Sequence, residues 1–299
     1  MSDVATTAVH AAPTASEYIV HHLTHLQNKK QTDIVDFSVF NLDSIFFSVV
    51  LGLLGSFLLW KAARKATSGV PGRFQAAVEI LFDMVNDQAK SIVHNATSRK
   101  LVAPLALTVF VWVFLLNAMD LLPLDFLPWI WEKIYGAMGH DPHHAYLRVV
   151  PTADLSVTMG LSVGVLLVCL FYNMKIKGLG GWAHELVSAP FGTSKNPFFA
   201  VILAVVNVAE QLISFTAKTV SHGMRLFGNM YAGELVFMLI ALLGGAWAFS
   251  FEPGSLALLG MHVVAGWAWA VFHIIIIALQ AFVFMMLTLV YIGQAHDAH

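Results

Sequence analysis

Residues 198–249 read FFAVILAVVNVAEQLISFTAKTVSHGMRLFGNMYAGELVFMLIALLGGAWAF, and this almost uniformly apolar stretch decides the fold. As one α-helix it would measure roughly 75 Å. The hydrocarbon core of a bilayer is only roughly 30 Å thick, so such a helix must tilt strongly, bend or break. The alternative is two ordinary spans joined inside the stretch. The candidate break points are Gly223, Gly228, Gly233, Gly244 and Gly245.

The rest of the chain has the same apolar character. Residues 44–60, 101–119 and 155–174 each have about the length of a single membrane span, and residues 263–291 are longer. Of the 299 residues, 58% are hydrophobic and 11% are charged, and the mean hydropathy is +0.73. An ordinary soluble domain is about 25% charged, so a water-soluble protein is excluded. We predict an all-α polytopic membrane protein with about five transmembrane helices, the last two long and strongly tilted.

Lysine and arginine counts orient the helices, because cytoplasmic loops are enriched in these residues. Residues 61–100 carry seven of them, whereas residues 120–154 carry two against five carboxylates. Residues 175–197 carry three and residues 250–262 carry none. These counts predict an extracytoplasmic N-terminus and a cytoplasmic C-terminus. The expected regions are an extracytoplasmic extension over 1–43, three membrane helices within 44–197 with an outer loop over 120–154, and a long tilted helical hairpin over 198–299 with a short cytoplasmic tail.

A separate amphipathic helix is predicted over residues 72–95, between the first two spans. Its apolar side chains recur at helical spacing, while the charged residues of this segment fall on the opposite face. Such a helix can lie on the cytoplasmic surface of the membrane. A helix that packs on a partner has the same pattern, so both interpretations stay open.

Charged side chains are rare in the last third of the chain, and four of them interrupt the stretch 198–249. A charge near the bilayer centre costs about 2.5–3.5 kcal/mol on insertion scales, so each needs a polar cavity, a partner or a function. At about 100° per residue, polar side chains form one stripe along this helix, and Glu234 lies about 180° away from Arg225. The stripe consists of Asn207, Gln211, Ser214, Lys218, Ser221, Arg225 and Asn229, with Glu210 and His222 on its flanks.

The last apolar stretch has its own polar line, because His262, His273 and Gln280 fall within about 20° of one another. Two apolar helices with one hydrophilic seam each suggest a water or proton route between or beside them. The alternative is interhelical hydrogen bonding that holds a bundle together. This alternative suits serine and asparagine, whereas a guanidinium brings a permanent charge that such a role does not need.

Residues 224–234, MRLFGNMYAGE, resemble the signature of subunit a of the rotary F-type ATP synthases in its bacterial form. The resemblance covers most of the chain. It includes IFFSVVLGLL at 45–54, KATSGVPG at 65–72, APLALT at 103–108, MDLLP at 119–123, LRVVP at 147–151, FHI at 272–274 and LQAF at 279–282.

The resemblance implies a stator that conducts protons past a rotating ring of c subunits, each with one membrane carboxylate. Arg225 matches the essential arginine of the family. A fixed cation lowers the pKa of a neighbouring carboxyl, so an arriving ring site is driven to release its proton. Arginine cannot itself relay protons, so it can separate two half-channels. Positions associated with the arginine and the outer half-channel are matched by Glu234, His273, Asn229 and Gln280, and another acid near the outer mouth is matched by Asp120.

The inner half-channel departs from the family pattern. Family members can carry a glutamate fourteen residues before the arginine, and here that position is Gln211, preceded by Glu210. A shift of one residue rotates a side chain by about 100°. Either Glu210 substitutes from the flank, or Gln211 and Ser214 line a watery exit without an acid.

The resemblance also implies partners and a location. The expected partners are the c-subunit ring, the b-subunit peripheral stalk, the rest of the ATP synthase complex and membrane lipid, in a bacterial inner (plasma) membrane. No catalytic chemistry of its own and no cofactor is expected. The sequence lacks the P-loop pattern G-x-x-x-x-G-K-[ST], so the chain cannot be the nucleotide-hydrolysing subunit. The formal net charge of -2 leaves no basic arm for nucleic acid.

Two other classes of function remain open. In a secondary ion antiporter, Arg225, Glu234 and His273 would form an autonomous substrate site. In a structural anchor between ring and stalk, the same residues would tolerate neutral replacements. Residues 139–146, GHDPHHAY, are interpreted as a solvated outer loop, with a metal site as the alternative, and the tail residues His296 and His299 are treated in the same way.

Overall fold

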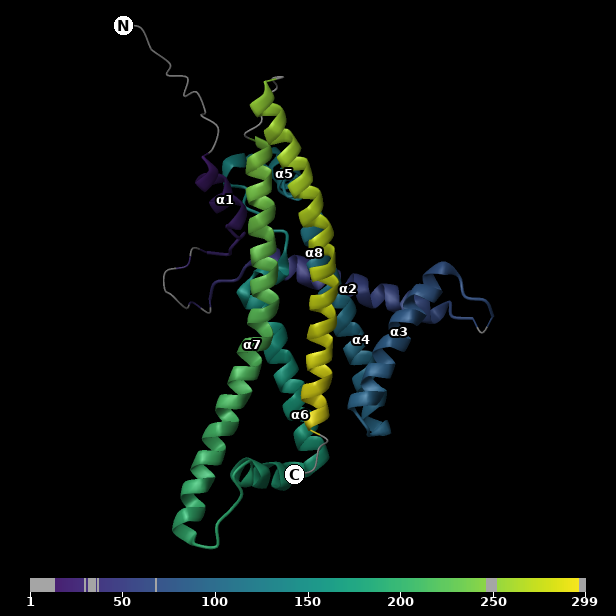
Figure 1. Ribbon diagram of the computed structural model, residues 1–299, viewed down its shortest axis with the longest axis vertical. Helices are drawn as coiled ribbons and strands as arrows, with labels where there is room; N and C mark the ends of the chain where they lie inside the picture. Colours follow the sequence, from purple (N-terminus) through teal and green to yellow (C-terminus); the bar gives the residue numbers. More distant parts are fainter. Residues whose placement is uncertain are drawn as a thin grey trace.

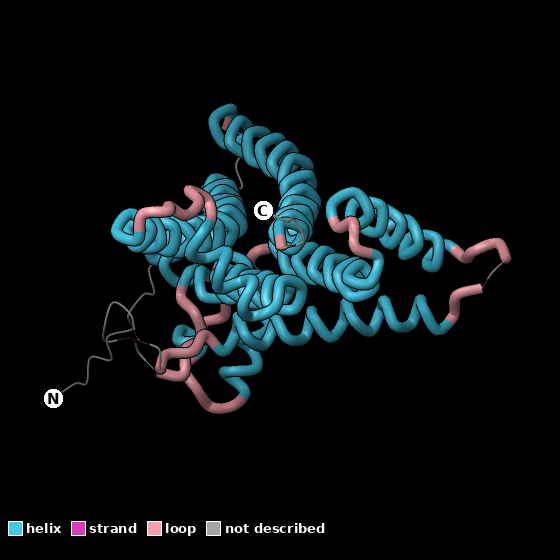
Figure 2. The backbone as a smooth tube through the Cα atoms, turned by 90° about the horizontal axis from the view of Figure 1, so that it is seen from below, coloured by secondary structure: helices cyan, strands magenta, loops and turns pink. Residues whose placement is uncertain are grey.

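The computed structural model describes residues 14–29, 31, 36, 38–67, 69–245 and 252–295, and the regular elements within these ranges are helices (Figures 1 and 2). Five of the helices are long and apolar enough to cross a membrane. The prediction of an all-α polytopic membrane protein is therefore confirmed. Residues 1–13 and the tail residues His296 and His299 lie outside the described residues.

The membrane-length helices are α2 (Leu42–Arg64), α4 (Ala96–Ala118), α6 (Leu155–Ser188), α7 (Pro197–Gly245) and α8 (Pro253–Gln294). The shorter helices are α1 (Ala15–Leu23), α3 (Arg73–Ile92) and α5 (Phe126–Ala137), joined by the 3-10 turns η1 (Met119–Leu121), η2 (Pro142–His144) and η3 (Pro151–Ala153).

Helix α7 is one continuous helix of 49 residues, so the alternative of two ordinary spans is wrong. Pro197 begins this helix. Proline lacks a backbone N–H, and this costs nothing in the first turn, where an N–H has no partner within the helix. The Asn196 side chain accepts a hydrogen bond from the Phe198 N–H at 3.2 Å and caps this end. The helix passes Gly223, Gly228 and Gly233 without a break and ends at Gly245.

Helices α7 and α8 are steeply inclined relative to α2 (Figure 1). Helix α2 has 23 residues and measures about 35 Å, close to the thickness of a bilayer. It lies crosswise to α7 and α8 in Figure 1. A membrane that α2 spans upright therefore forces α7 and α8 to lie strongly tilted, as their lengths of 49 and 42 residues require.

Helix α6 extends beyond the predicted span. Asp154 caps its start by accepting a hydrogen bond from the Ser156 N–H at 2.8 Å. Gly178 has φ 70° and ψ 163°, a conformation that favours glycine, and it divides the element into a long and a short helical segment. The short segment turns away and runs toward the start of α7 (Figure 1).

The predicted amphipathic helix is α3, and half of it packs inside the chain. Val85, Ala89 and Val93 are buried in the core formed with α4 and α8. Phe74 and Phe82, nearer its start, remain exposed. The pattern that suggested a membrane surface is thus explained over its second half by contacts with the protein's own helices.

Within the predicted N-terminal extension, α1 docks on the body of the protein. Thr14 and Glu17 form a capping box, in which Glu17 Oε2 accepts from the Thr14 N–H at 2.8 Å and Thr14 Oγ1 accepts from the Glu17 N–H at 3.3 Å. Helix α1 contacts α7, and His22 of α1 lines a small cavity together with Glu234 of α7.

Candidate functional site

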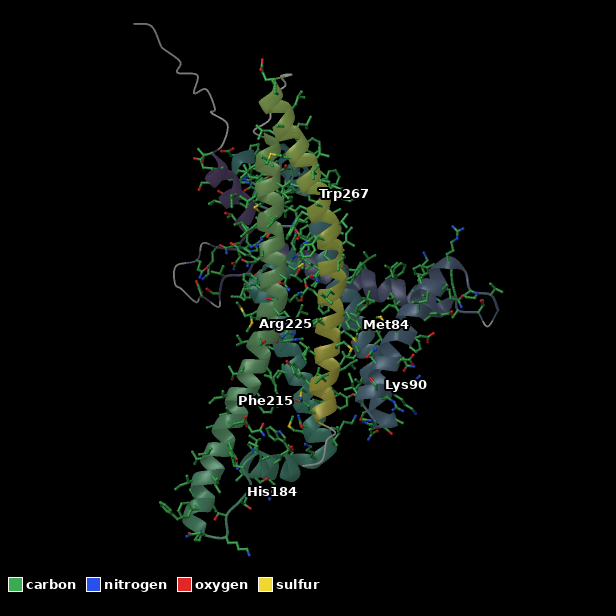
Figure 3. The ribbon with its side chains drawn as sticks, in the orientation of Figure 1. Met84, Lys90, His184, Phe215, Arg225 and Trp267 are labelled. Carbon is green, nitrogen blue, oxygen red and sulfur yellow. The ribbon has the colours of Figure 1, made fainter. Side chains whose placement is uncertain are left out.

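Arg225 lies near the middle of α7 and is exposed (Figure 3). Within the described ranges, its guanidinium has no ion pair and no hydrogen bond. Its neighbours on the same face are small and exposed: Ser221, Gly228, Asn229 and Ala232. A surface of small residues allows the backbone of another helix to approach closely. The arrangement presents an unpaired cation to whatever covers this face.

His273 and Asp120 form a buried pair between α8 and η1. Nε2 of His273 lies 2.6 Å from Oδ2 of Asp120, and both side chains are almost fully buried. Gly233 on α7 makes room for the imidazole, because a Cβ there would lie 2.3 Å from His273 Cε1. The glycine of the quoted motif thus sets how closely α7 approaches His273.

Glu234, the next residue on α7, points inward and pairs with an arginine. Its Oε2 accepts a hydrogen bond from Arg148 Nη2 at 2.5 Å, and both side chains are buried. Arg148 Nη1 also lies 3.1 Å from Nε2 of His25, and the Arg148 N–H donates to Asp43 Oδ2 at 3.0 Å. Buried charges need such partners, since an isolated ion is costly to bury. We call Asp120, Arg148, Glu234 and His273 the outer cluster.

A third ion pair lies at the outer edge of this cluster. Nε2 of His22, on α1, lies 2.9 Å from Oδ1 of Asp125, which also accepts a hydrogen bond from the Tyr18 hydroxyl at 3.1 Å. Burial disfavours the charged His22 ring, but the hydrogen bonds to Asp125 and to the Tyr18 carbonyl outweigh it and raise the pKa of His22. The hydrogen bond from His22 lowers the pKa of Asp125, although partial burial opposes this.

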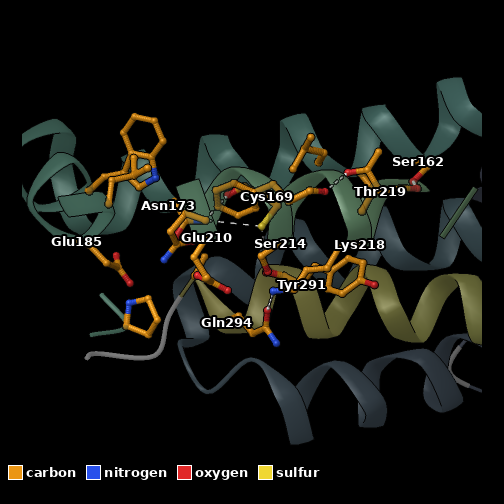
Figure 4. Close-up of a pocket in the computed structure, with 18 residues that line it drawn as sticks. Ser162, Cys169, Asn173, Glu185, Glu210, Ser214, Lys218, Thr219, Tyr291 and Gln294 are labelled. Carbon is orange, nitrogen blue, oxygen red and sulfur yellow. Dashed lines mark hydrogen bonds between the residues drawn. The ribbon is translucent and has the colours of Figure 1, made fainter. Parts of the chain in front are cut away.

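A polar cavity of about 410 Å³ lies between α6, α7 and α8 (Figure 4), and we call it the inner cavity. Glu210, Gln211 and Ser214 all line it, so the structure brings together the residues that the sequence offered as alternatives. Lys218 Nζ donates a hydrogen bond to Gln294 Oε1 at 3.1 Å across it. Its remaining polar lining includes Ser162, Asn173, Glu185, Thr219 and Tyr291.

Apolar side chains separate the outer cluster from the inner cavity. On α7, Leu226 and Met230 lie between the residues of the two polar regions, and both are fully buried. On α8, Ile277, Phe284 and Met285 belong to the same core. Two buried polar side chains lie among them: Gln280 of α8, and His222 of α7, whose ring centroid is 3.8 Å from that of Phe284. We call the five apolar residues the apolar plug. Arg225 lies beside the plug on the exposed face of α7, so the structure does not bring it together with Glu234 and His273.

The remaining predicted residues have varied surroundings. Asn207 is a structural residue, because its side chain bonds Val187 O at the end of α6 and Gly192 O and the Phe191 N–H in the loop before α7. Asn229 is exposed next to Arg225, and Gln280 is buried on α8. The structure places no group of three or more metal-ligating side chains together within its described ranges.

The profile of a family described as the ATP synthase A chain matches residues 45–293 of the chain. This chain belongs to the ATP synthase A chain family. It is similar to ATP synthase subunit a of Paracidovorax citrulli, with 72% identity over 288 residues covering 96% of this chain and 98% of that protein. It is also similar to ATP synthase subunit a of Psychrobacter cryohalolentis, with 46% identity over 297 residues covering 94% and 96% of the two chains.

Membership of the ATP synthase A chain family makes the chain a multi-pass membrane subunit of the Fo sector. Sequence reasoning about this family member missed Arg148, His25, Asp43 and His22 as members of the polar network. They lie in loops, at helix ends and in the N-terminal segment, where no helical periodicity identifies them from the sequence. One signal was present for Arg148, because it is one of two basic residues in a loop that is otherwise acidic.

Proposed function

We propose that this chain is the proton-conducting stator subunit of a rotary ATP synthase, providing two half-channels to the c-subunit ring. One observation carries the proposal: the apolar plug lies between two polar regions along α7 and α8, and Arg225 is exposed beside it. Along α7, Arg225 is about 10 Å from Lys218 and about 13 Å from Glu234. In this proposal, a proton that leaves one region reaches the other outside the chain, carried by a ring carboxylate.

The outer cluster is proposed as the outer half-channel. Asp120, Glu234 and His273 are titratable groups held in close contact by buried pairs. Histidine and carboxylate can exchange protons near neutral pH when their surroundings adjust their affinities. Asn229 and Gln280 are proposed to line the passage from this cluster toward the ring.

The inner cavity is proposed as the inner half-channel. Its volume exceeds that needed for several waters, and Glu210 supplies an acid from the flank while Gln211 and Ser214 supply neutral polar groups. Both alternatives from the sequence are combined in this proposal, because all three residues line the same space. Glu185, in an ion pair with Lys177 at 2.7 Å, adds a second carboxylate to the lining.

Arg225 is proposed to act on the ring carboxylate by electrostatics. Its unpaired charge lowers the proton affinity of a carboxyl that passes close to it, which drives release on arrival. A guanidinium stays protonated, so it does not pass protons between the two half-channels. Attraction between the arginine and the bare carboxylate also favours a defined ring position.

The rest of the proposal concerns the assembly. The chain is non-catalytic, its N-terminus is periplasmic, and its C-terminus is cytoplasmic in the bacterial inner membrane. Its partners are the c-subunit ring on the Arg225 face and the b-subunit peripheral stalk. Residues 198–299 form the translocation core, residues 44–197 support it, and residues 1–43 lie on the outer side.

The deciding experiment measures ATP-driven acidification of inverted membrane vesicles that carry Arg225→Ala. Thr216→Ala is the matched control, since Thr216 is also exposed on α7 and its hydroxyl bonds only Leu212 O of its own helix. Immunoblotting confirms assembly of both variants. We expect loss of pumping in Arg225→Ala and normal pumping in the control. Normal pumping in Arg225→Ala would refute the proposal.

Two further measurements separate the other classes of function. An autonomous antiporter exchanges ions after reconstitution of the purified chain alone, whereas this subunit should not. A structural anchor should keep pumping when Glu234 and His273 are replaced by glutamine, as long as the complex assembles. The separation of Arg225 from Glu234 and His273 argues against one autonomous substrate site.

A further inference from the structure

The N-terminal helix places a histidine at the edge of the outer cluster. His22 lies at the end of α1, and its two ring nitrogens face oxygen atoms: Nδ1 lies 3.0 Å from the Tyr18 carbonyl oxygen and Nε2 lies 2.9 Å from Asp125 Oδ1. Two acceptors suit the doubly protonated ring, which donates from both nitrogens. Asp125 is mostly exposed, with 67% of its side-chain surface open, so this pair connects to the outside.

A small cavity joins His22 to the outer cluster. It has a volume of about 20 Å³ and is lined by His22, Asp120 and Glu234 together with apolar side chains such as Leu147 and Val149. About 10–15 Å³ is sufficient for one water, which also needs polar partners. Three titratable side chains around a water-sized space satisfy both conditions.

We infer that His22 is the outermost proton-exchanging residue of the outer half-channel, and that it passes protons to Glu234 or Asp120 through one water in this cavity. The inference rests on the proposed function, since it adds a residue to that half-channel. The N-terminal segment thereby becomes part of the ion path.

The proton transfers balance as follows. A proton from the outside reaches Nε2 of His22 directly or from the Asp125 carboxyl group, which leaves the ring protonated on both nitrogens. A change of side-chain rotamer then breaks the Nε2 hydrogen bond to Asp125, and Nε2 gives its proton to the water. The water passes one of its protons to the carboxylate of Glu234 or Asp120. The neutral ring keeps its Nδ1 proton, returns to Asp125 and takes the next proton on Nε2.

The charge of His22 is set by groups on several elements. Asp125 is its direct partner and its hydrogen bond raises the pKa of His22, while burial acts in the opposite direction. Glu234 also favours the charged ring through space. The titratable and charged groups that face this site are Tyr18 and His21 from α1, Asp125 before α5, Asp120 from η1, Glu234 from α7 and Arg148 from the outer loop.

The test measures passive proton conduction through complete Fo in inverted vesicles stripped of the catalytic sector. Potassium influx with valinomycin makes the vesicle lumen positive and drives protons out of it. The lumen of an inverted vesicle corresponds to the outer side of the membrane. The luminal pH is varied from about 5.5 to 8.5, which spans the pH range over which histidine titrates. The probe is the proton itself. His22→Gln keeps a donor toward Asp125 but cannot titrate in this range. The matched control is His21→Gln, because His21 is adjacent and does not line the cavity.

The inference predicts a distinct result for each variant. His22→Gln should conduct about tenfold more slowly, a smaller loss of rate than removal of a general acid–base catalyst usually causes. It should also lose one step of the pH profile of conduction. Asp125→Asn should move that step to lower pH, because Asp125 raises the pKa of His22. Val149→Ile should fill the cavity and slow conduction without moving the step. His21→Gln should match the unmodified complex.

Two results would overturn the inference. One is an unchanged rate and pH profile in His22→Gln. The other is slower conduction in His22→Gln with an unshifted step in Asp125→Asn and full conduction in Val149→Ile, which would make α1 a purely structural support. Either result leaves the proposed function intact if ATP-driven pumping still requires Arg225, so the two failures are distinguishable.

Discussion

The imidazole of His273 occupies the space that a side chain at position 233 would need. A Cβ on Gly233 would lie 2.3 Å from His273 Cε1 and 2.9 Å from its Nδ1. The same imidazole contacts Asp120 at 2.6 Å on its other nitrogen. The spacing of α7 and α8 therefore determines whether the His273–Asp120 pair can form.

Gly233→Ala should displace His273 and break its contact with Asp120. Overpacking of this kind costs about 1–3 kcal/mol, and the pair lies in the proposed outer half-channel. We expect proton pumping to fall severalfold and the solubilised complex to lose heat stability. Gly180→Ala is the control, because a Cβ at Gly180 meets no atom within 4 Å. Equal pumping by the two variants would contradict the steric explanation.

Arg148→Ala should be among the most damaging single changes in the outer loop. It leaves Glu234 buried without its 2.5 Å partner, and breaking a buried ion pair costs about 3–5 kcal/mol. The double variant Arg148→Met with Glu234→Gln removes both charges and should recover assembly. Thermal inactivation of the purified complex measures the difference. Additive losses in the double variant would show that the two charges do not depend on each other.

Ser214→Phe should block the inner cavity. Ser214 lines this space, and a benzyl group would displace water from it. We expect passive conduction through Fo to fall by about tenfold or more, which corresponds to a rise of about 1.4 kcal/mol or more in the activation free energy. Thr216→Phe, two residues away on an exposed face of α7, should conduct normally provided that the complex assembles. A fast Ser214→Phe complex would exclude this cavity from the ion path.

Docking of α1 should depend on pH through His22 and Asp125. The raised pKa of His22 gives stabilisation that is fully present below 6.5, its ordinary value, and is lost as the pH rises through the raised value. The lowered pKa of Asp125 gives stabilisation that is present above 3.8 and is lost as the pH falls through the lowered value. Protease protection of α1 should therefore be greatest between these ordinary values.

The measurement is limited proteolysis of vesicles whose outer face is accessible, with the released N-terminal fragment quantified at each pH. Asp125→Asn supplies the comparison. It removes the carboxylate partner of His22, so protection should become weaker and should respond less to rising pH. An identical pH dependence in this variant would mean that another group controls α1.

The membrane helices could be predicted from the sequence because apolar length and helical periodicity are local signals. The length of the stretch 198–249 left one long tilted helix and two joined spans as alternatives, and α7 is continuous from Pro197 to Gly245. The local pattern also placed Glu234 on the face opposite Arg225, and in the structure Glu234 is buried while Arg225 is exposed.

Long-range pairings could not be predicted in the same way. The partner of Glu234 is Arg148, which lies 86 residues earlier in a loop without periodicity. The docking of α1 depends on contacts with α7 and with Asp125 that no local pattern encodes. The presence of Glu210 and Gln211 in one cavity also could not be predicted, because α6 supplies the third wall of that cavity.

The apolar plug also has an electrical consequence. Water conducts and an apolar protein core insulates, so with water in both polar regions the membrane voltage falls mainly across the plug. One elementary charge moved through 100 mV gains about 2.3 kcal/mol, whatever the distance over which the voltage falls. A shorter insulating path therefore means a stronger local electric field. Under the proposed function, that field is concentrated beside Arg225, where the force on a mobile charge in a neighbouring helix would be greatest.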